Sequence, residues 1–257
     1  MEVVSVALVD GRAAEVRRLG SPTGRPVLYF HSPAGSGEEL DGAAERAAGE
    51  LDIELLTIVR RSLADYGEAG SFMATVASDT VLVAEALGLS SVSVLGWSGG
   101  GPYALAASDR LGPVARSVHL VSPLPLLTGS HAVPHPSDRL QQIAATSPTS
   151  NWVTAPGALR DYMALVAPWP FDVSSVAQPV TIWAPTEDEI VPPRLIDHLA
   201  RQLPRVEIVH VHGSHDWITT TGRRSSNRSL TRSPAPPPMR RTMSPWRRLV
   251  APVRRSA

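Results

Sequence analysis

The stretch SVSVLGWSGGGPYALAA, residues 91–107, contains a β-branched apolar run, then a serine set among glycines, then an alanine-rich segment. The first part favours a strand and the last part favours a helix. Between them, Gly96-Trp97-Ser98-Gly99-Gly100 matches G-x-S-x-G, in which small residues allow a sharp strand-to-helix turn that exposes the serine hydroxyl. We therefore expect Ser98 to be a nucleophile and Gly99 to offer its N–H to a developing oxyanion. The alternative is a glycine-rich turn with an incidental serine.

The rest of the chain alternates between the hydrophobic patterns of strands and of helices. The expected strands are 3–9 and 14–19, joined as a hairpin at Asp10-Gly11, and 26–30, 53–59, 91–95, 117–121, 180–183 and 206–211. The expected helices are one capped by Ser36 with Leu40, Ala43, Ala44, Ala47 and Ala48 on one face, one at 75–87, one ending near 112 and one at 193–203. This alternation predicts an α/β fold with a doubly wound, mostly parallel β-sheet.

Two segments depart from the alternation and set the expected domain organisation. Between about residues 123 and 178 it gives way to Pro, Ser and short amphipathic pieces, which we interpret as a short cap insertion. Residues 223–257 hold ten arginines, many Ser and Pro, and no Asp or Glu. That composition predicts a disordered tail. We therefore expect one domain over residues 1–222, followed by the tail.

Composition narrows the chemistry further. With 43% hydrophobic residues in 257, the chain can bury one substantial core. It has no cysteine and no lysine, which excludes thiol nucleophiles, Cys-ligated zinc, a P-loop lysine and a Schiff-base lysine. No apolar run is long enough to cross a bilayer and the N-terminus lacks a leader pattern, so a cytoplasmic location is expected.

Two further motifs complete a resemblance to a known superfamily. The run VTIWAPTEDEIVP, residues 180–192, places acids in a turn after a predicted strand, and Gly213-Ser214-His215 follows the last predicted strand. With the G-x-S-x-G turn, these motifs resemble the α/β-hydrolase superfamily over residues 3–217. The resemblance implies Ser98 as nucleophile, Asp188 as the orienting acid and His215 as the general base, in the chain order of that fold. Glu187 and Glu189 remain alternatives to Asp188 by a shift of one residue.

The segment Phe30 to Ser36 resembles the superfamily's H-G-x-P-G turn, whose third residue normally donates a second oxyanion N–H. Here that residue is Pro33, which has no N–H, and Ser32 stands where the superfamily has glycine. We expect either that Ala34 donates beside Gly99 or that one donor is missing. The turn at 59–67 also keeps little of the superfamily's D-R-P-G-Y-G, and the expected last helix is absent after Trp217.

Other readings of the same residues point to different functions. Residues 99–104 fit the dinucleotide pattern G-x-G-x-x-A, but no acid ends the following strand to bind a ribose. His210, His212 and His215 approach a binuclear metal motif, with Ser214 where an acidic ligand belongs. The arginine-rich tail could contact phosphates or an anionic membrane.

On balance the sequence predicts a serine hydrolase acting on a small ester, lactone or related acyl bond without a cofactor or metal. Proline iminopeptidase, carbon–carbon hydrolase and perhydrolase reactions use the same triad, and a non-catalytic binding protein of this fold is the competing class. The expected partner is a small-molecule acyl substrate, with no nucleic acid or membrane, and a homodimer is left open. Trp97, Trp152, Trp169 and Phe171 are the predicted pocket-lining residues.

Overall fold

The computed structural model describes residues 2–33, 37–40, 42–60, 69–125, 164–165 and 167–219 of the 257-residue chain. The tail at 223–257 and most of the expected cap therefore lie outside the described residues. The site that the sequence predicts lies within them, except for Ala34.

A single eight-stranded sheet forms the centre of the molecule, with the strand order β1-β2-β4-β3-β5-β6-β7-β8. The strands are β1 (Glu2–Ala7), β2 (Ala13–Gly20), β3 (Arg25–Phe30), β4 (Ile53–Ile58), β5 (Val92–Trp97), β6 (Ala115–Val121), β7 (Val180–Pro185) and β8 (Val206–Val211). β1 pairs with β2 and β2 with β4 in antiparallel fashion, and all other pairs are parallel. The predicted hairpin and mostly parallel sheet are confirmed.

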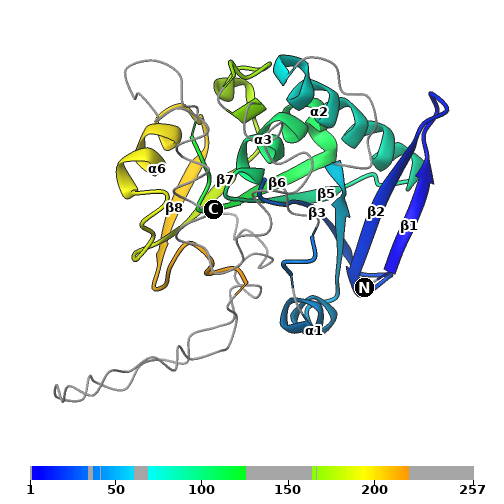
Figure 1. Ribbon diagram of the computed structural model, residues 1–257, viewed down its shortest axis with the longest axis horizontal. Coiled ribbons are helices and arrows are strands. Elements are labelled where there is room, and N and C mark those ends of the chain that lie inside the picture. The colour runs from blue at the N-terminus through cyan, green and yellow to red at the C-terminus, as the bar shows by residue number, and fades with distance from the viewer. Residues whose placement is uncertain are drawn as a thin grey trace, which may run out of the picture.

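Helices cover both faces of this sheet (Figure 1). The described helices are α1 (Gly42–Glu50), α2 (Ala69–Ala86), α3 (Gly100–Leu111) and α6 (Pro193–Ala200), with short 3₁₀ turns at Gly112–Val114 and Val173–Ser175. α2, α3 and α6 share one face, where they build the larger apolar core with β-strand residues such as Val94 and Ile182. α1 lies on the opposite face over β2 and β4 and contributes Ala44 and Ala48 to a second core.

The first helix begins later than its sequence pattern predicts. α1 starts at Gly42, whereas the capping interpretation placed its start at Ser36, which lies outside the described residues. Two acids that precede this helix make contacts outside it: Glu38 pairs with Arg17 at 2.6 Å, and Glu39 accepts hydrogen bonds from the Tyr29 hydroxyl and the Gly37 N–H. Residues 38 and 39 are therefore held by contacts with β2 and β3 and do not form a first helical turn.

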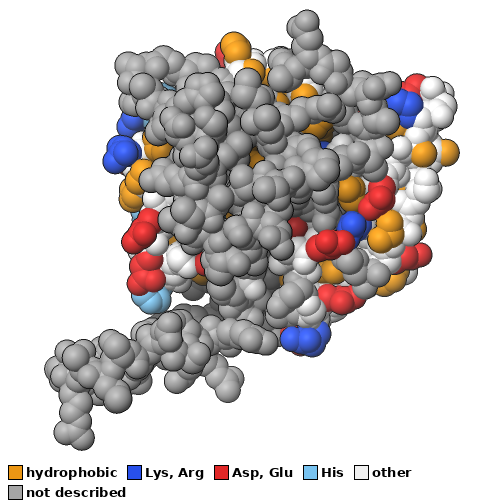
Figure 2. Space-filling view, in the orientation of Figure 1, with side chains coloured by type: hydrophobic (Ala, Val, Ile, Leu, Met, Phe, Trp, Pro, Cys, Tyr) orange, Lys and Arg blue, Asp and Glu red, His pale blue; other side chains and the backbone are white. Residues whose placement is uncertain are grey.

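Two other helix boundaries also differ from the prediction. α2 begins at Ala69 and not at Thr75, because buried Phe72 and Met73 extend its apolar face into the core. α6 ends at Ala200 and not at Leu203. None of the described helices is long and apolar enough to cross a membrane. Figure 2 shows acidic and basic side chains mixed over the visible part of the described surface.

A histidine is buried on the same face of the sheet as α1. His119 on β6 is 9% exposed, and its Nε2 lies 3.2 Å from the Ser117 hydroxyl, while its Nδ1 has no hydrogen-bond partner among the described residues. Burial, which penalises the charged imidazolium, lowers the pKa of His119 to about 4 from its ordinary 6.5.

This shift predicts acid sensitivity of the fold. Between about pH 6.5 and pH 4 the unfolded chain binds a proton at His119 that the folded chain does not, so the free energy of unfolding falls as pH falls, by on the order of 3 kcal/mol. The free energy of unfolding, measured with urea at several pH values, should fall less with decreasing pH in His119→Gln than in the wild type. His210→Gln, which removes an exposed histidine from β8, is the control and should match the wild type. Parallel curves for all three proteins would contradict the prediction.

Candidate active site

Ser98 occupies a strained turn between β5 and α3. Its φ of 54° lies in the left-handed region that residues with a side chain rarely adopt. Backbone hydrogen bonds hold the turn: the Ser98 N–H donates to the Val121 carbonyl at 2.9 Å, and the N–H groups of Gly101 and Leu124 donate to the Ser98 carbonyl. A backbone outlier held on all sides is typical of a functional residue.

The glycines around Ser98 are required by close contacts with protein atoms. A Cβ at Gly100 would lie 2.0 Å from the Phe30 carbonyl oxygen, and one at Gly96 would lie 2.8 Å from the Ala104 Cβ. α3 can therefore approach β3 and β5 only because these positions lack side chains. Packing accounts for the glycines, so the dinucleotide pattern at 99–104 needs no phosphate to explain it.

His215 follows β8 and reaches back to the nucleophile turn. Its Nε2 lies 2.9 Å from the Ser98 hydroxyl. The indole N–H of Trp97, the residue before the serine, donates to the His215 carbonyl at 2.9 Å, and the two rings lie 5.9 Å apart. Trp97 was predicted from the sequence only as a pocket-lining residue. Its hydrogen bond links β5 to the loop after β8 that carries His215.

Asp188 follows β7 and holds the other side of the imidazole. Its carboxylate oxygens lie 3.0 and 3.1 Å from the His215 Nδ1. The side chain is fully buried and its Oδ1 also accepts the N–H groups of Ile190 and Val191, both at 2.9 Å. Burial alone would raise the pKa of Asp188, but the hydrogen bond and charge of His215 together with the Val191 N–H lower it below its ordinary value.

The two neighbouring acids do not reach the histidine. Glu189 is exposed, and Glu187 lies 3.5 Å from the Nδ1 of exposed His212. Of the three acids in the turn, Asp188 alone points its carboxylate at His215. Ser98, His215 and Asp188 thus form one hydrogen-bonded series at the carboxyl ends of β5, β8 and β7. The catalytic roles of these three residues stay a prediction.

The loop after β3 lies beside this series. A Cβ on Gly99 would lie 2.6 Å from the Cδ of Pro33, so the proline ring packs directly against the residue that follows the serine. Ala34, the expected second donor, lies outside the described residues.

A buried arginine fixes the start of that loop. Arg60, 1% exposed, donates from Nη1 to the His31 carbonyl at 3.0 Å and from Nη2 to the Ser32 carbonyl at 3.1 Å. Its guanidinium also stacks over the Tyr103 ring at 4.4 Å from the centroid, and this cation–π contact helps to offset burial of the charge. From the sequence, Arg60 was identified only as part of an altered turn, because its carbonyl partners are about thirty residues away in the chain.

The remaining predicted residues fall in three groups. Trp169 is buried and stacks on Phe171 at 5.7 Å, whereas Trp152 lies outside the described residues. His210 and His212 are exposed, and the described residues contain no cluster of three His, Cys, Asp or Glu side chains that could hold a metal ion.

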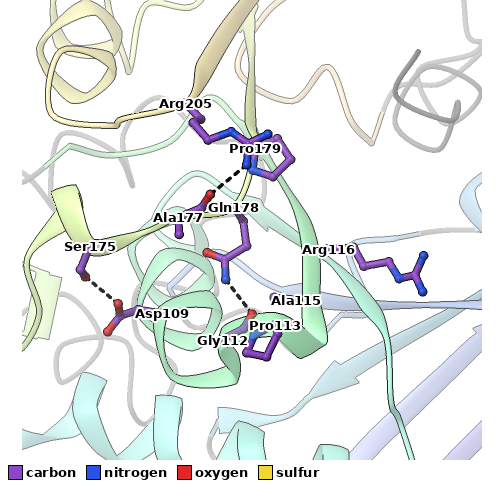
Figure 3. A pocket seen from close by; sticks show the side chains of 10 residues that line it. All are labelled: Asp109, Gly112, Pro113, Ala115, Arg116, Ser175, Ala177, Gln178, Pro179 and Arg205. Atoms are coloured by element: carbon purple, nitrogen blue, oxygen red, sulfur yellow. Dashed lines mark hydrogen bonds between the residues drawn. The ribbon is translucent and has the colours of Figure 1, made fainter. Parts of the chain in front are cut away.

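A groove lies at the opposite edge of the sheet, where the strands begin (Figure 3). It is lined by residues near the amino ends of β6, β7 and β8, among them Gln178, Arg116 and Arg205. In the figure Arg116 points away from the others. Since Ser98, Asp188 and His215 all follow carboxyl ends of strands, this groove is separate from the candidate active site.

The packing of Gly100 gives a direct test of the nucleophile turn. Gly100→Ala should destabilise the fold by about 3 kcal/mol or more, because the new methyl would overlap the Phe30 carbonyl and the backbone cannot move away. Gly49→Ala is the matched control: it lies in α1 with open space around it, so the change should be neutral or stabilise by up to about 1 kcal/mol. Thermal unfolding measures both. Equal melting temperatures for the two variants would refute the close contact between Gly100 and the Phe30 carbonyl.

Comparisons with known proteins agree on the architecture. No family model and no curated protein matches the sequence. A hydrolase from Pseudomonas aeruginosa PA01 is similar in structure with a TM-score of 0.67 at 14% identity, over 84% of this chain and 92% of that one. The 2-hydroxy-6-oxo-6-phenylhexa-2,4-dienoate hydrolase from Rhodococcus sp. strain RHA1 has a TM-score of 0.61 at 14% identity, over 84% and 92%. The enol-lactonase from Burkholderia xenovorans LB400 has a TM-score of 0.61 at 13% identity, over 83% and 93%. With its strand order and these neighbours, the chain has the α/β-hydrolase fold.

Proposed function

We propose that this chain is a serine hydrolase that cleaves a small ester, lactone or related acyl bond through an acyl-enzyme on Ser98. The observation that carries the proposal is the hydrogen-bonded series from Asp188 through His215 to Ser98, with the serine in a left-handed turn. A serine hydroxyl becomes a useful nucleophile when a neutral imidazole is placed to take its proton. At 2.9 Å, the His215 Nε2 is within reach of that proton.

In the proposed reaction the Ser98 Oγ attacks the acyl carbon while its proton passes to the His215 Nε2. A C–O bond forms and the carbonyl π electrons move onto the oxygen, giving a tetrahedral oxyanion. When the oxyanion collapses, the bond to the leaving oxygen breaks and that oxygen takes the proton from His215. Water then attacks the acyl-enzyme with His215 as base, releasing the acid and restoring the Ser98 hydroxyl.

Asp188 supports the histidine in both halves of this cycle. Because its pKa is lowered, its carboxylate stays ionised at neutral pH and can accept the Nδ1–H of His215. That hydrogen bond selects the tautomer with a free Nε2 lone pair and stabilises the imidazolium that forms after proton transfer. The two backbone donors from Ile190 and Val191 keep the carboxylate in place.

The oxyanion requires donors from the backbone around Ser98. The Gly99 N–H makes no hydrogen bond to described residues and lies at the amino end of α3, where the helix dipole favours negative charge. The second donor is either the Ala34 N–H or is missing, because Pro33 has no N–H. The competing class is a non-catalytic binding protein of this fold, which the proline beside Gly99 favours.

Substitution of the nucleophile tests the proposal. Ser98→Ala should lower kcat for p-nitrophenyl acetate and butyrate by about 10⁴-fold or more, and Asp188→Asn by about 10⁴-fold through loss of the correct tautomer. Ser90→Ala, an exposed serine before the same strand, is the matched control and should retain full activity. Circular dichroism confirms that each variant is folded. Retention of most activity in folded Ser98→Ala would refute the nucleophile assignment.

A further inference from the structure

The loop after β3 meets the nucleophile turn through a proline ring and not through an amide. The Cβ position of Gly99 lies 2.6 Å from the Cδ and 2.7 Å from the Cγ of Pro33, so the ring is in van der Waals contact with the Gly99 backbone. In a proline the Cδ is bonded to nitrogen where every other residue carries its amide hydrogen. The side of residue 33 that faces Gly99 is therefore a methylene group, which cannot donate a hydrogen bond.

The position of this ring is fixed by the groups around it. β3 and β5 are neighbours in the sheet, so the loop leaving Phe30 runs beside the turn leaving Trp97. Arg60 holds the carbonyls of His31 and Ser32, the two residues before the proline. The Leu165 Cδ1 lies 2.8 Å from the same Cβ position of Gly99, so Leu165 and the proline ring both pack around it. Arg60 thus holds the backbone that leads into Pro33, and the proline ring packs against the nucleophile turn.

In the proposed acyl transfer, negative charge develops on the substrate carbonyl oxygen next to the residue that follows the nucleophile. In this fold the oxyanion is bound by the N–H after the nucleophile and by an N–H from the loop after β3. Of the described residues in that loop, Pro33 is the one that packs on Gly99, and the Gly37 N–H is already bonded to Glu39. Loss of one donor typically lowers kcat by about 10²- to 10³-fold.

We propose that Pro33 weakens the oxyanion site and thereby restricts the hydrolase to activated acyl substrates, meaning aryl esters and thioesters in place of alkyl esters. The inference rests on the proposed function. An activated ester has a good leaving group, so its transition state is earlier and less negative charge develops on the carbonyl oxygen. An alkyl ester develops more charge there and depends more on the missing donor. Only interactions that strengthen in the transition state change the rate, so the loss falls unequally on the two classes.

The test restores the N–H and measures how the gain depends on the leaving group. kcat/KM is measured for p-nitrophenyl, phenyl and ethyl acetate with the full chain and with Pro33→Ala and Pro33→Gly. Both substitutions supply an amide hydrogen, and the second covers the case in which the first does not fold. Pro204→Ala, an exposed proline at the amino end of β8, is the matched control. A fluorophosphonate probe reports on the Ser98 nucleophile independently of the leaving group.

We expect the wild type and Pro204→Ala to lose activity steeply from p-nitrophenyl to ethyl acetate. Either Pro33 variant should raise kcat/KM for ethyl acetate by about 10²- to 10³-fold, with a gain of less than about tenfold for p-nitrophenyl acetate. No gain, or loss of activity in both folded variants, would overturn the inference and indicate that another amide, such as that of Ala34, completes the site. An equal gain on all three esters would overturn the substrate preference. If the probe labels none of the proteins at Ser98, the proposed hydrolase itself is wrong, and the inference is overturned with it.

Discussion

The candidate site depends on one close approach, between the backbone of Gly100 at the start of α3 and the carbonyl of Phe30 at the end of β3. No side chain fits there, since a Cβ would lie 2.0 Å from the carbonyl oxygen. This contact lets the helix begin directly beside two strand ends, immediately after the left-handed turn at Ser98. Helix amides, the serine hydroxyl and the loop after β3 are thereby brought within a few ångströms of one another. A side chain at residue 100 would separate all three.

The parallel sheet then brings the other two side chains to the same edge. Carboxyl ends of parallel strands lie side by side, so Asp188 after β7 and His215 after β8 are delivered next to the turn after β5. Local contacts complete the alignment: two backbone N–H groups hold the Asp188 carboxylate, and the Trp97 indole holds the histidine loop. The sheet brings the Asp188 and His215 side chains close to Ser98, and these hydrogen bonds then fix their orientation.

Features encoded by short stretches could be predicted from the sequence, and features that depend on distant contacts could not. The strands, the hairpin and the turn at Ser98 follow from local periodicity and glycine placement, and the structure contains them. The start of α1 was mispredicted because Glu38 and Glu39 interact with Arg17 and Tyr29 and not with the helix. The sequence resemblance selected Asp188 and left Glu187 and Glu189 as alternatives. In the structure the Asp188 carboxylate is the one that faces His215, an alignment set by how the turn after β7 meets the loop after β8. The role of Arg60 was missed for the same reason, since its carbonyl partners belong to another loop.

In the proposed reaction, the groups for proton transfer and the groups for charge stabilisation belong to different parts of the fold. Asp188 and His215 arrive from β7 and β8, whereas the groups around the developing oxyanion belong to α3 and the loop after β3. A substitution in that loop can therefore change how much charge the site tolerates without disturbing the hydrogen bonds that activate Ser98. This separation explains how a chain can hold the Asp188–His215–Ser98 series in good geometry while a proline ring packs against Gly99. Given the proposed function, the series governs whether an acyl bond can be attacked. The β3 loop governs which acyl bonds react at a useful rate.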